Sequence, residues 1–182
     1  MSLCGIDEAG RGPIAGPLVM AGVILQNEIE GLRDSKVLSE KKREQLFEKI
    51  ITNASFHIVH FTALQIDEMG ISKCLRLGLQ EIMQEIQSDD FLFDGNSTFG
   101  ALGLRTMVKA DAKIDEVSAA SILAKVTRDR EMVQFALQFP EYGFERHKGY
   151  GTSAHVEAIR QYGYCDIHRR SFKLKALEPT LF

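Results

Sequence analysis

The sequence predicts an α/β protein in which a sheet is flanked by helices. Two observations support this prediction. Five short apolar runs of strand length are separated by turn residues, and segments with helical periodicity lie between several of them. A strand that follows a crossover helix favours parallel pairing. The length of 182 residues, with 45% hydrophobic and 26% charged residues, is ordinary for one globular domain.

The first two strands are expected to form an antiparallel pair. A short apolar segment leads into residues 5–13, Gly-Ile-Asp-Glu-Ala-Gly-Arg-Gly-Pro. The glycines of this stretch free the backbone, and its proline interrupts regular hydrogen bonding. Residues 17–25 form a near-continuous apolar run, typical of a buried strand that returns from the turn. After a polar loop, a helix is expected from Ser39, as N-cap, to about Ile51.

The next strand is expected at residues 56–61, and it contains two histidines. His57 and His60 have opposite parity, so we interpret them as ordinary strand residues rather than as a pair of metal ligands. An amphipathic helix is predicted from Ile71 to about Ile86. The remaining expected elements are strands at residues 89–94 and 104–110, a long helix from 115 to about 135, and a helix over 152–162.

The distribution of charge indicates a polyanionic partner more than the net charge does. A net charge of -3 argues against indiscriminate binding of nucleic acid. Residues 1–100 are net acidic and residues 101–182 net basic, with basic side chains prevalent over 146–175. This basic region is suited to a polyanionic substrate, although a solvated helix face has the same composition.

The cellular setting is expected to be the cytoplasm. No apolar run approaches the ~20 residues that a membrane helix needs, and the first residues do not resemble a signal peptide. The three cysteines are scattered and form no CxxC pair. Reduced structural thiols are therefore expected, rather than disulfides or a zinc site.

Carboxylates follow three of the predicted strands. Asp7 and Glu8 follow the first, Asp94 the fourth and Asp111 the fifth. If these strands are neighbours, four acids share one edge of the sheet and repel one another unless divalent cations intervene. Successive strand residues point to opposite faces, so Asp7 and Glu8 converge only if the strand ends or bulges there. Oxygen ligands favour Mg²⁺ or Mn²⁺ over zinc, but aspartate is also a common residue at strand exits.

Seven motifs, taken in order, resemble the bacterial ribonuclease HII family. They are G-I-D-E-A-G-R-G-P, L-R-D-S-K, F-D-G, K-A-D-A-K, A-A-S-I-L-A-K-V-T-R-D, H-K-G-Y-G-T-x-x-H and H-R-R-S-F, and they run from about residue 5 to 172. The resemblance implies a ribonuclease H-like core with a mixed five-stranded sheet, three strands antiparallel and two parallel. It also implies a catalytic core over residues 1–136 and a helical extension over 137–182, packed as a single structural domain.

The same resemblance implies an activity. The expected reaction is hydrolysis of the phosphodiester 5′ of ribonucleotides embedded in duplex DNA, and of RNA in RNA–DNA hybrids, by two-metal-ion catalysis. Products would carry 3′-hydroxyl and 5′-phosphate ends, and the expected process is ribonucleotide excision repair. The implied cofactor is Mg²⁺ or Mn²⁺, and the implied enzyme is a monomer that binds nucleic acid and no membrane. Two alternatives are a related nuclease or strand-transferase acting on plain DNA or only on hybrids, and a non-enzymatic nucleic-acid-binding module.

The family's functional residues fall on matching positions of this chain. Its catalytic, metal-binding acids correspond to Asp7, Glu8, Asp94 and Asp111. Its 2′-hydroxyl sensor corresponds to Gly10, Arg11 and Gly12, where glycines would let the backbone approach a sugar. Tyr150 corresponds to a tyrosine that packs on a sugar, although a core tyrosine in a tight turn is the alternative. Candidate phosphate contacts, which could also be solvated side chains, are Lys36, Lys125, Arg128, Lys148 and Arg169.

Two positions depart from the family pattern. Ala110 stands where the family commonly has glycine, and Tyr164 stands where it commonly has proline. Both differences affect only the local main-chain conformation, and the four acids are present.

Overall fold

The computed structural model describes residues 2–32 and 38–173, so the candidate phosphate contact Lys36 lies outside the described residues. One five-stranded sheet has the strand order β3-β2-β1-β4-β5. β2 pairs antiparallel with β1 and β3, whereas β4 pairs parallel with β1 and β5. The expected mixed sheet and its antiparallel first pair are confirmed. The strands are β1 (Leu3–Ala9), β2 (Leu18–Leu25), β3 (Ala54–Phe61), β4 (Asp90–Asp94) and β5 (Arg105–Met107).

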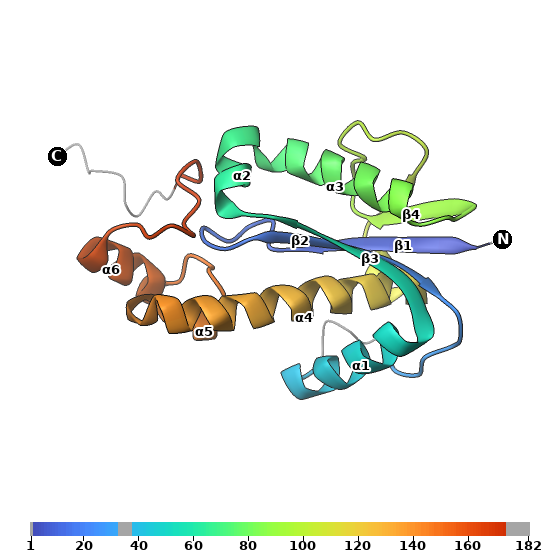
Figure 1. Cartoon of the computed structure of the whole chain (residues 1–182), viewed down its shortest axis with the longest axis horizontal. Coiled ribbons are helices and arrows are strands. Elements are labelled where there is room, and N and C mark those ends of the chain that lie inside the picture. The colour runs from blue at the N-terminus through green and yellow to red at the C-terminus, as the bar shows by residue number, and fades with distance from the viewer. Residues whose placement is uncertain (1, 33–37, 174–182) are drawn as a thin grey trace.

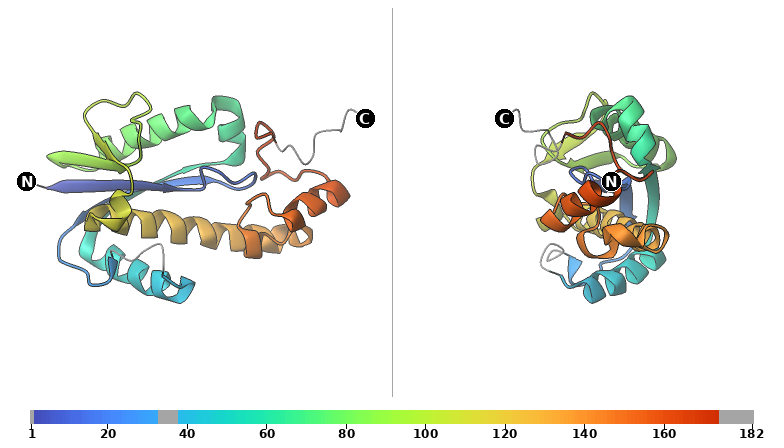
Figure 2. Two further views of the ribbon diagram at one scale, coloured as in Figure 1. Left: turned by 180° about the vertical axis from the view of Figure 1, so that it is seen from behind. Right: turned by 90° about the vertical axis from the view of Figure 1, so that its left-hand side faces the viewer.

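Helices cover both faces of the sheet. α2 and α3 lie on one face, α1 and α4 on the other, and α5 and α6 lie beyond one end of the strands (Figure 1). The view along the long axis shows the sheet between these two helical layers (Figure 2). The helices are α1 (Glu40–Asn53), α2 (Ala63–Met69), α3 (Ile71–Glu85), α4 (Asp115–Gln138), α5 (Phe144–His147) and α6 (Ser153–Tyr162), with 3₁₀ turns η2 (Ala110–Ala112) and η3 (Pro140–Tyr142). No helix within the described ranges is long and apolar enough to cross a membrane.

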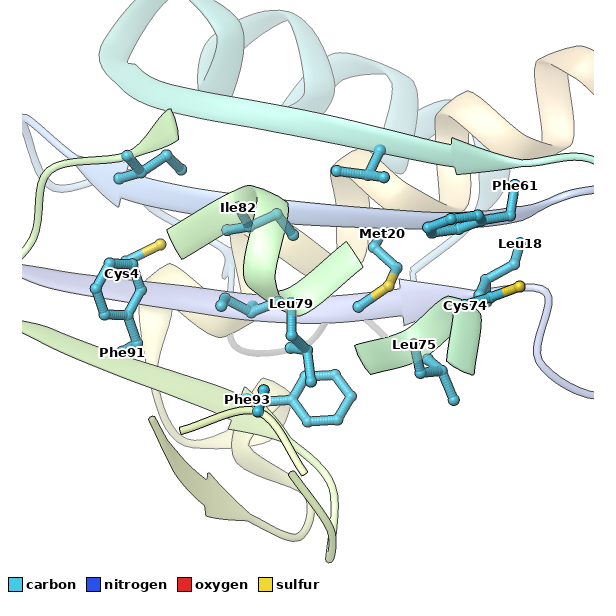
Figure 3. Packing of buried hydrophobic residues seen from close by; sticks show 14 of the residues in the cluster. Cys4, Leu18, Met20, Phe61, Cys74, Leu75, Leu79, Ile82, Phe91 and Phe93 are labelled. Atoms are coloured by element: carbon cyan, nitrogen blue, oxygen red, sulfur yellow. The ribbon is translucent and has the colours of Figure 1, made fainter. Parts of the chain in front are cut away.

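The core on the α3 face follows from strand alternation. Cys4 and Ile6 of β1 point toward α3, and both are fully buried. The predicted amphipathic face of α3 meets them, with Leu79 and Ile82 above the strands (Figure 3). Because Cys4 and Ile6 fill this core, the following Asp7 is directed to the opposite face, toward Ser121 of α4.

The opposite face depends on a close approach between α4 and β1. A side chain at Gly5 would collide with the main chain of Glu116 and Val117, so only glycine fits there. The small residues at the start of α4 were expected to allow this approach, and Ala119 and Ala120 are fully buried against the sheet. The approach brings later residues of α4 beside the carboxyl end of β1.

Two of the differences from the sequence prediction concern β5 and α2. The fifth strand was expected to reach residue 110, but β5 ends at Met107 because Lys109 adopts a left-handed conformation (φ 58°) that ends strand geometry. The short helix α2 was not predicted, although its signal is present as a capping box between Thr62 and Gln65. The expected domain boundary at 136/137 falls within the last turn of α4, which ends at Gln138.

Candidate active site

Three aspartates converge where β1 and β4 end side by side. Asp7, Asp94 and Asp111 each offer one carboxylate oxygen, and these oxygens all lie within 4.8 Å of one another. Asp111 is fully buried and Asp7 is 8% exposed. Within the described part of the chain, this is the only group of three or more His, Cys, Asp or Glu side chains so arranged. The sequence prediction of a shared acidic edge holds for these three residues.

Asp94 organises the turn that delivers Asp111. Its Oδ1 accepts a hydrogen bond from the main-chain N–H of Lys109 at 2.9 Å, and its Oδ2 accepts one from that of Asp111 at 3.2 Å. Asp111 lies in the 3₁₀ turn η2. The sequence pattern predicted it directly after the fifth strand. The left-handed Lys109 turns the chain back, so that the carboxylates of Asp94 and Asp111 meet.

Glu8 lies next to the cluster but does not belong to it. β1 keeps a regular register with β2 through Ala9, without a bulge, yet the carboxyl group of Glu8 is in hydrogen-bonding contact with that of Asp7 and close enough to Asp94 to interact with its charge. Glu8 therefore adjoins the three aspartates at the same edge, outside the group whose oxygens all lie within 4.8 Å of one another. Glu8 Oε1 is 4.0 Å from a guanidinium nitrogen of Arg11. Its Oε2 is buried and, among the described residues, accepts no hydrogen bond.

Burial and mutual repulsion raise the pKa values of Asp7, Glu8 and Asp94. Burial raises the pKa of Asp7 well above its ordinary value, and the carboxylates of Glu8 and Asp94 raise it further, while a hydrogen bond from Ser121 opposes the shift. Burial also raises the pKa of Glu8, against the opposing effect of Arg11, and that of Asp94. A bound divalent cation would relieve this desolvation and repulsion, so the donor set fits a metal that prefers oxygen ligands.

A pocket of about 350 Å³ lies beside the acids. Gly10, with φ +91°, begins the turn that forms one wall, and a Cβ atom there would collide with Arg128 and with the carbonyl of Pro17. Glu8 lines this pocket, and its carboxyl group also interacts with those of Asp7 and Asp94. The side chains and turns around the pocket are Glu8, Ala9, Gly10, Arg11, Gly12, Arg43, Ser121, Ile122, Lys125, Arg128 and Tyr150.

Tyr150 is tied to the same turn. The main-chain N–H groups of Ile14 and Ala15 donate to the carbonyl of Gly149 at 2.9 and 3.2 Å. This connection places Tyr150, which is 47% exposed, on the wall of the pocket, with its ring centre 5.9 Å from the guanidinium carbon of Arg128. Tyr150 is therefore a surface aromatic residue rather than a core one.

The candidate phosphate contacts divide into two kinds. Arg128 and Arg169 are each 1% exposed, and their guanidinium groups donate to main-chain carbonyls of residues 10–17. Arg128 also lines the pocket, whereas Arg169 is not among its lining residues. Lys125 and Lys148 are half-buried: Lys125 Nζ lies 2.7 Å from Asp129 Oδ1, and Lys148 donates to the carbonyl of Glu145.

The structure also brings in residues that sequence reasoning did not single out. Arg43 of α1 lines the pocket, but a single arginine on an amphipathic helix gives no signal of this. Ser121 was interpreted as a small packing residue, yet it hydrogen-bonds Asp7. By contrast, His57 and His60 pair separately with Glu81 and Glu131, which agrees with their interpretation as ordinary strand residues.

This mixed sheet, with its carboxylates converging where parallel strands end, defines a ribonuclease H-like protein. The sequence model of the family described as ribonuclease HII matches residues 4–175. The ribonuclease HII of Sulfurovum sp. (strain NBC37-1) is 64% identical over 181 residues, which cover 99% of this chain and 96% of the relative. The chain belongs to the ribonuclease HII family.

Two solved structures share the fold over nearly the whole chain. The ribonuclease HII of Archaeoglobus fulgidus, solved in a complex with PCNA, aligns with a TM-score of 0.85 at 29% identity, covering 100% of this chain and 98% of that one. The ribonuclease H2 of Pyrococcus horikoshii OT3 aligns with a TM-score of 0.78 at 32% identity, covering 95% and 94%. The similarity therefore includes the C-terminal region as well as the sheet.

Proposed function

We propose that this enzyme hydrolyses the phosphodiester on the 5′ side of a ribonucleotide embedded in duplex DNA, leaving 3′-hydroxyl and 5′-phosphate ends. As a ribonuclease HII, it also cleaves the RNA of RNA–DNA hybrids. One observation carries the proposal: the aspartate cluster lies beside a pocket whose wall contains Gly10, Arg11, Gly12 and Tyr150. A phosphate at the acids would place its sugar against this wall.

The metal site in this proposal consists of Asp7, Asp94 and Asp111, with Glu8 as a fourth ligand. The buried Oε2 of Glu8 supports its inclusion, because within the described residues it accepts no hydrogen bond. The ligands are carboxylates, which favours Mg²⁺ or Mn²⁺. A pair of such ions would lower the pKa of the attacking water and stabilise the leaving oxygen. The protein's own contribution is to hold the acids together, buried, before substrate binds.

The substrate side of the proposal assigns different roles to the basic residues. Gly10, Arg11 and Gly12 would contact the ribose 2′-hydroxyl, and Tyr150 would pack on the neighbouring sugar. Lys125 and Lys148 are partly exposed and remain candidate phosphate contacts, as does Lys36 beyond the described residues. Arg128 and Arg169 instead support the turn. Residues 137–182 act with the core over 1–136 as one structural domain.

A cleavage assay with three matched duplexes tests the proposal. They carry one ribonucleotide, a full RNA strand, or DNA only, and each is incubated with Mg²⁺, Mn²⁺ or EDTA. We expect metal-dependent cutting at the ribonucleotide junction and none of the all-DNA duplex. Equal cutting of all-DNA would identify a general nuclease, and metal-independent binding without cleavage would identify a binding module. The enzyme is expected to act as a monomer in the cytoplasm, which size-exclusion chromatography and cell fractionation would check.

A further inference from the structure

Arg169 is a buried cation that bonds almost entirely to one turn. Its Nε donates to the carbonyl of Gly16 at 2.9 Å, and its Nη1 donates to that of Pro13 at 2.9 Å. Its Nη2 donates to the carbonyl of Gly10 at 2.6 Å, and Nη1 also reaches that of Arg11 at 3.3 Å. No carboxylate forms an ion pair with it among the described residues. A planar fork of five donors suits such a set of carbonyls, whereas a lysine ammonium does not.

These bonds fix the direction of the N–H groups in the turn. In a trans peptide unit the C=O and the following N–H point in opposite directions, and the described chain contains no cis peptide. Because the carbonyls of Gly10 and Arg11 face Arg169, the N–H groups of Arg11 and Gly12 face away from it. Neither N–H donates a hydrogen bond within the described residues, and both residues line the pocket. Two free donors are thus directed away from the protein interior.

Arg169 is itself held firmly from two sides. Its main-chain N–H donates a hydrogen bond to the carbonyl of Ile14 at 2.8 Å. The main chain and the side chain of Arg169 therefore both bond to the same turn. The carboxylate of Asp67, on α2, accepts from the N–H groups of Arg170 at 2.8 Å and Ser171 at 2.9 Å. The C-terminal segment therefore bridges α2 and the turn, with Arg169 between them.

We propose that Arg169 is a positioning residue that aims the N–H groups of Arg11 and Gly12 at the sugar edge of the substrate, and so sets discrimination between ribonucleotide and deoxyribonucleotide. The inference rests on the proposed function, in which this turn senses the 2′-hydroxyl. The 2′-oxygen can accept a hydrogen bond from a main-chain donor, and a deoxyribose offers no such acceptor. Without the guanidinium group of Arg169, the peptide planes of the turn could rotate, and the difference in affinity between ribonucleotide and deoxyribonucleotide would be lost.

The test is a pair of dissociation constants, measured in EDTA so that no cleavage occurs. The probes are a duplex with one ribonucleotide and the same duplex in DNA only, and the proteins are the parent and Arg169→Lys. We expect the parent to prefer the ribonucleotide duplex and Arg169→Lys to lose at least about tenfold of that preference, with unchanged affinity for DNA. Tenfold corresponds to about 1.4 kcal/mol, the scale of one hydrogen bond.

Tyr142→Phe is the matched control for general loosening of the C-terminal region. Tyr142 is buried there and its hydroxyl donates to the carbonyl of Gly163 at 2.9 Å, away from the turn. This variant should lose stability but keep the preference. If Arg169→Lys weakened both duplexes equally, Arg169 would be a phosphate contact and the proposal would be overturned. An unchanged preference would overturn it as well.

A second variant decides the question if Arg169→Lys does not fold. Asp67→Asn leaves Arg169 in place and weakens only the anchor of Arg170 and Ser171, so it should lower the ribonucleotide preference by a smaller factor. An unchanged preference in a folded Asp67→Asn would then count against positioning by Arg169. Failure of the underlying function has a different signature: the parent itself would bind both duplexes equally.

Discussion

The carboxylate of Asp94 holds the turn after β5 at two points. Its two oxygens accept hydrogen bonds from the main-chain N–H groups of Lys109 and Asp111, at 2.9 and 3.2 Å. Asp94 is thus both a proposed metal ligand and the residue that places its neighbour Asp111. Asp7 accepts hydrogen bonds from its adjacent N–H, that of Glu8, and from Ser121, and it contacts the carboxyl group of Glu8, but none of these bonds holds a turn that carries another of the three aspartates. This difference separates the two aspartates experimentally.

Asp7→Asn and Asp94→Asn should both abolish metal-dependent cleavage but differ in stability. An asparagine at position 94 keeps one acceptor oxygen and turns an NH₂ group toward a main-chain donor, which leaves that N–H unsatisfied at a cost of about 1–3 kcal/mol. At position 7 the substitution mainly removes a repelling charge. We expect metal-free Asp94→Asn to unfold at lower urea concentration than Asp7→Asn. Equal midpoints would show that the two hydrogen bonds of Asp94 contribute little.

The stability gained by metal-free Asp7→Asn should depend on pH. The pKa of Asp7 is raised above its unfolded value, so ionisation of Asp7 opposes folding. The protonated carboxyl group of Asp7 makes its full contribution to the stability of the fold below the unfolded pKa, about 3.9. That contribution is lost as pH rises through the pKa of Asp7 in the folded protein. The stability of the variant relative to the parent should therefore increase as pH rises above about 4, as followed by urea unfolding in EDTA. A constant difference across this range would contradict the shift.

Metal should reverse this ranking. Bound Mg²⁺ or Mn²⁺ neutralises the clustered carboxylates and stabilises only the folded state. We expect the parent to melt at higher temperature with millimolar metal than in EDTA, and Asp7→Asn to show a much smaller rise. Glu8→Gln is the informative companion, because Glu8 lies outside the three-aspartate group. A rise equal to that of the parent would remove Glu8 from the proposed ligands.

Much of this site was predictable, and the exceptions have physical causes. Apolar runs and glycine-rich turns fix which residues form strands, so the meeting of Asp7 and Asp94 follows from parallel neighbours ending together. The position of Asp111 depends on the left-handed conformation of Lys109, and no local sequence pattern predicts that conformation. Likewise, composition cannot tell a solvated arginine from Arg128 or Arg169, because their burial depends on carbonyls turned inward by a distant turn.

Acid should destabilise the C-terminal region through a pair of histidines. His168 Nδ1 accepts from the N–H of Cys165, so its Nε2–H faces His155 Nε2 at 3.0 Å, and His155 Nδ1–H donates to the carbonyl of Tyr150. This chain of bonds needs both rings neutral, and burial lowers the pKa of each from 6.5 to about 4. A depressed histidine pKa stabilises the fold above pH 6.5, and that stability is lost as pH falls toward 4.

The size of this loss is on the order of a few kcal/mol for the pair. Urea unfolding of the parent from pH 7.5 to 4.5 should show a steep decline that is shallower in His155→Gln. His57→Gln serves as the control, because His57 lies on β3 with Glu81 and outside the histidine pair. Parallel declines in the parent and His155→Gln would assign the acid sensitivity to other groups.

Tyr150 should contribute to catalysis through its ring face rather than its hydroxyl. Stacking of an aromatic ring on a nucleotide is worth about 1–3 kcal/mol, so Tyr150→Ala should lower kcat/KM by roughly 10- to 100-fold on the one-ribonucleotide duplex. Tyr150→Phe should retain most of the activity. Tyr164, 43% exposed and not among the residues lining the pocket, offers a matched control as Tyr164→Ala. Equal losses in both alanine variants would rule out a specific role.

Gly10 and Gly12 flank Arg11 and differ in whether the free protein has room for a side chain there. At Gly10 a Cβ atom would collide with Arg128 and Pro17, and the φ of +91° disfavours any other residue. Gly10→Ala should therefore cost at least roughly 1–2 kcal/mol of stability and displace the turn. At Gly12 a Cβ atom would meet nothing within 4 Å in the free protein. Gly12→Ala should keep the parent's stability within about 0.5 kcal/mol.

The activity of Gly12→Ala then isolates contact with the substrate. If the sugar approaches this turn closely, the added methyl group should raise KM for the one-ribonucleotide duplex while the urea midpoint stays unchanged. In Gly10→Ala, activity and stability should fall together, because the turn itself is disturbed. A fully active Gly12→Ala would mean that substrate does not approach Gly12 closely, and sugar sensing would have to lie elsewhere on the pocket wall.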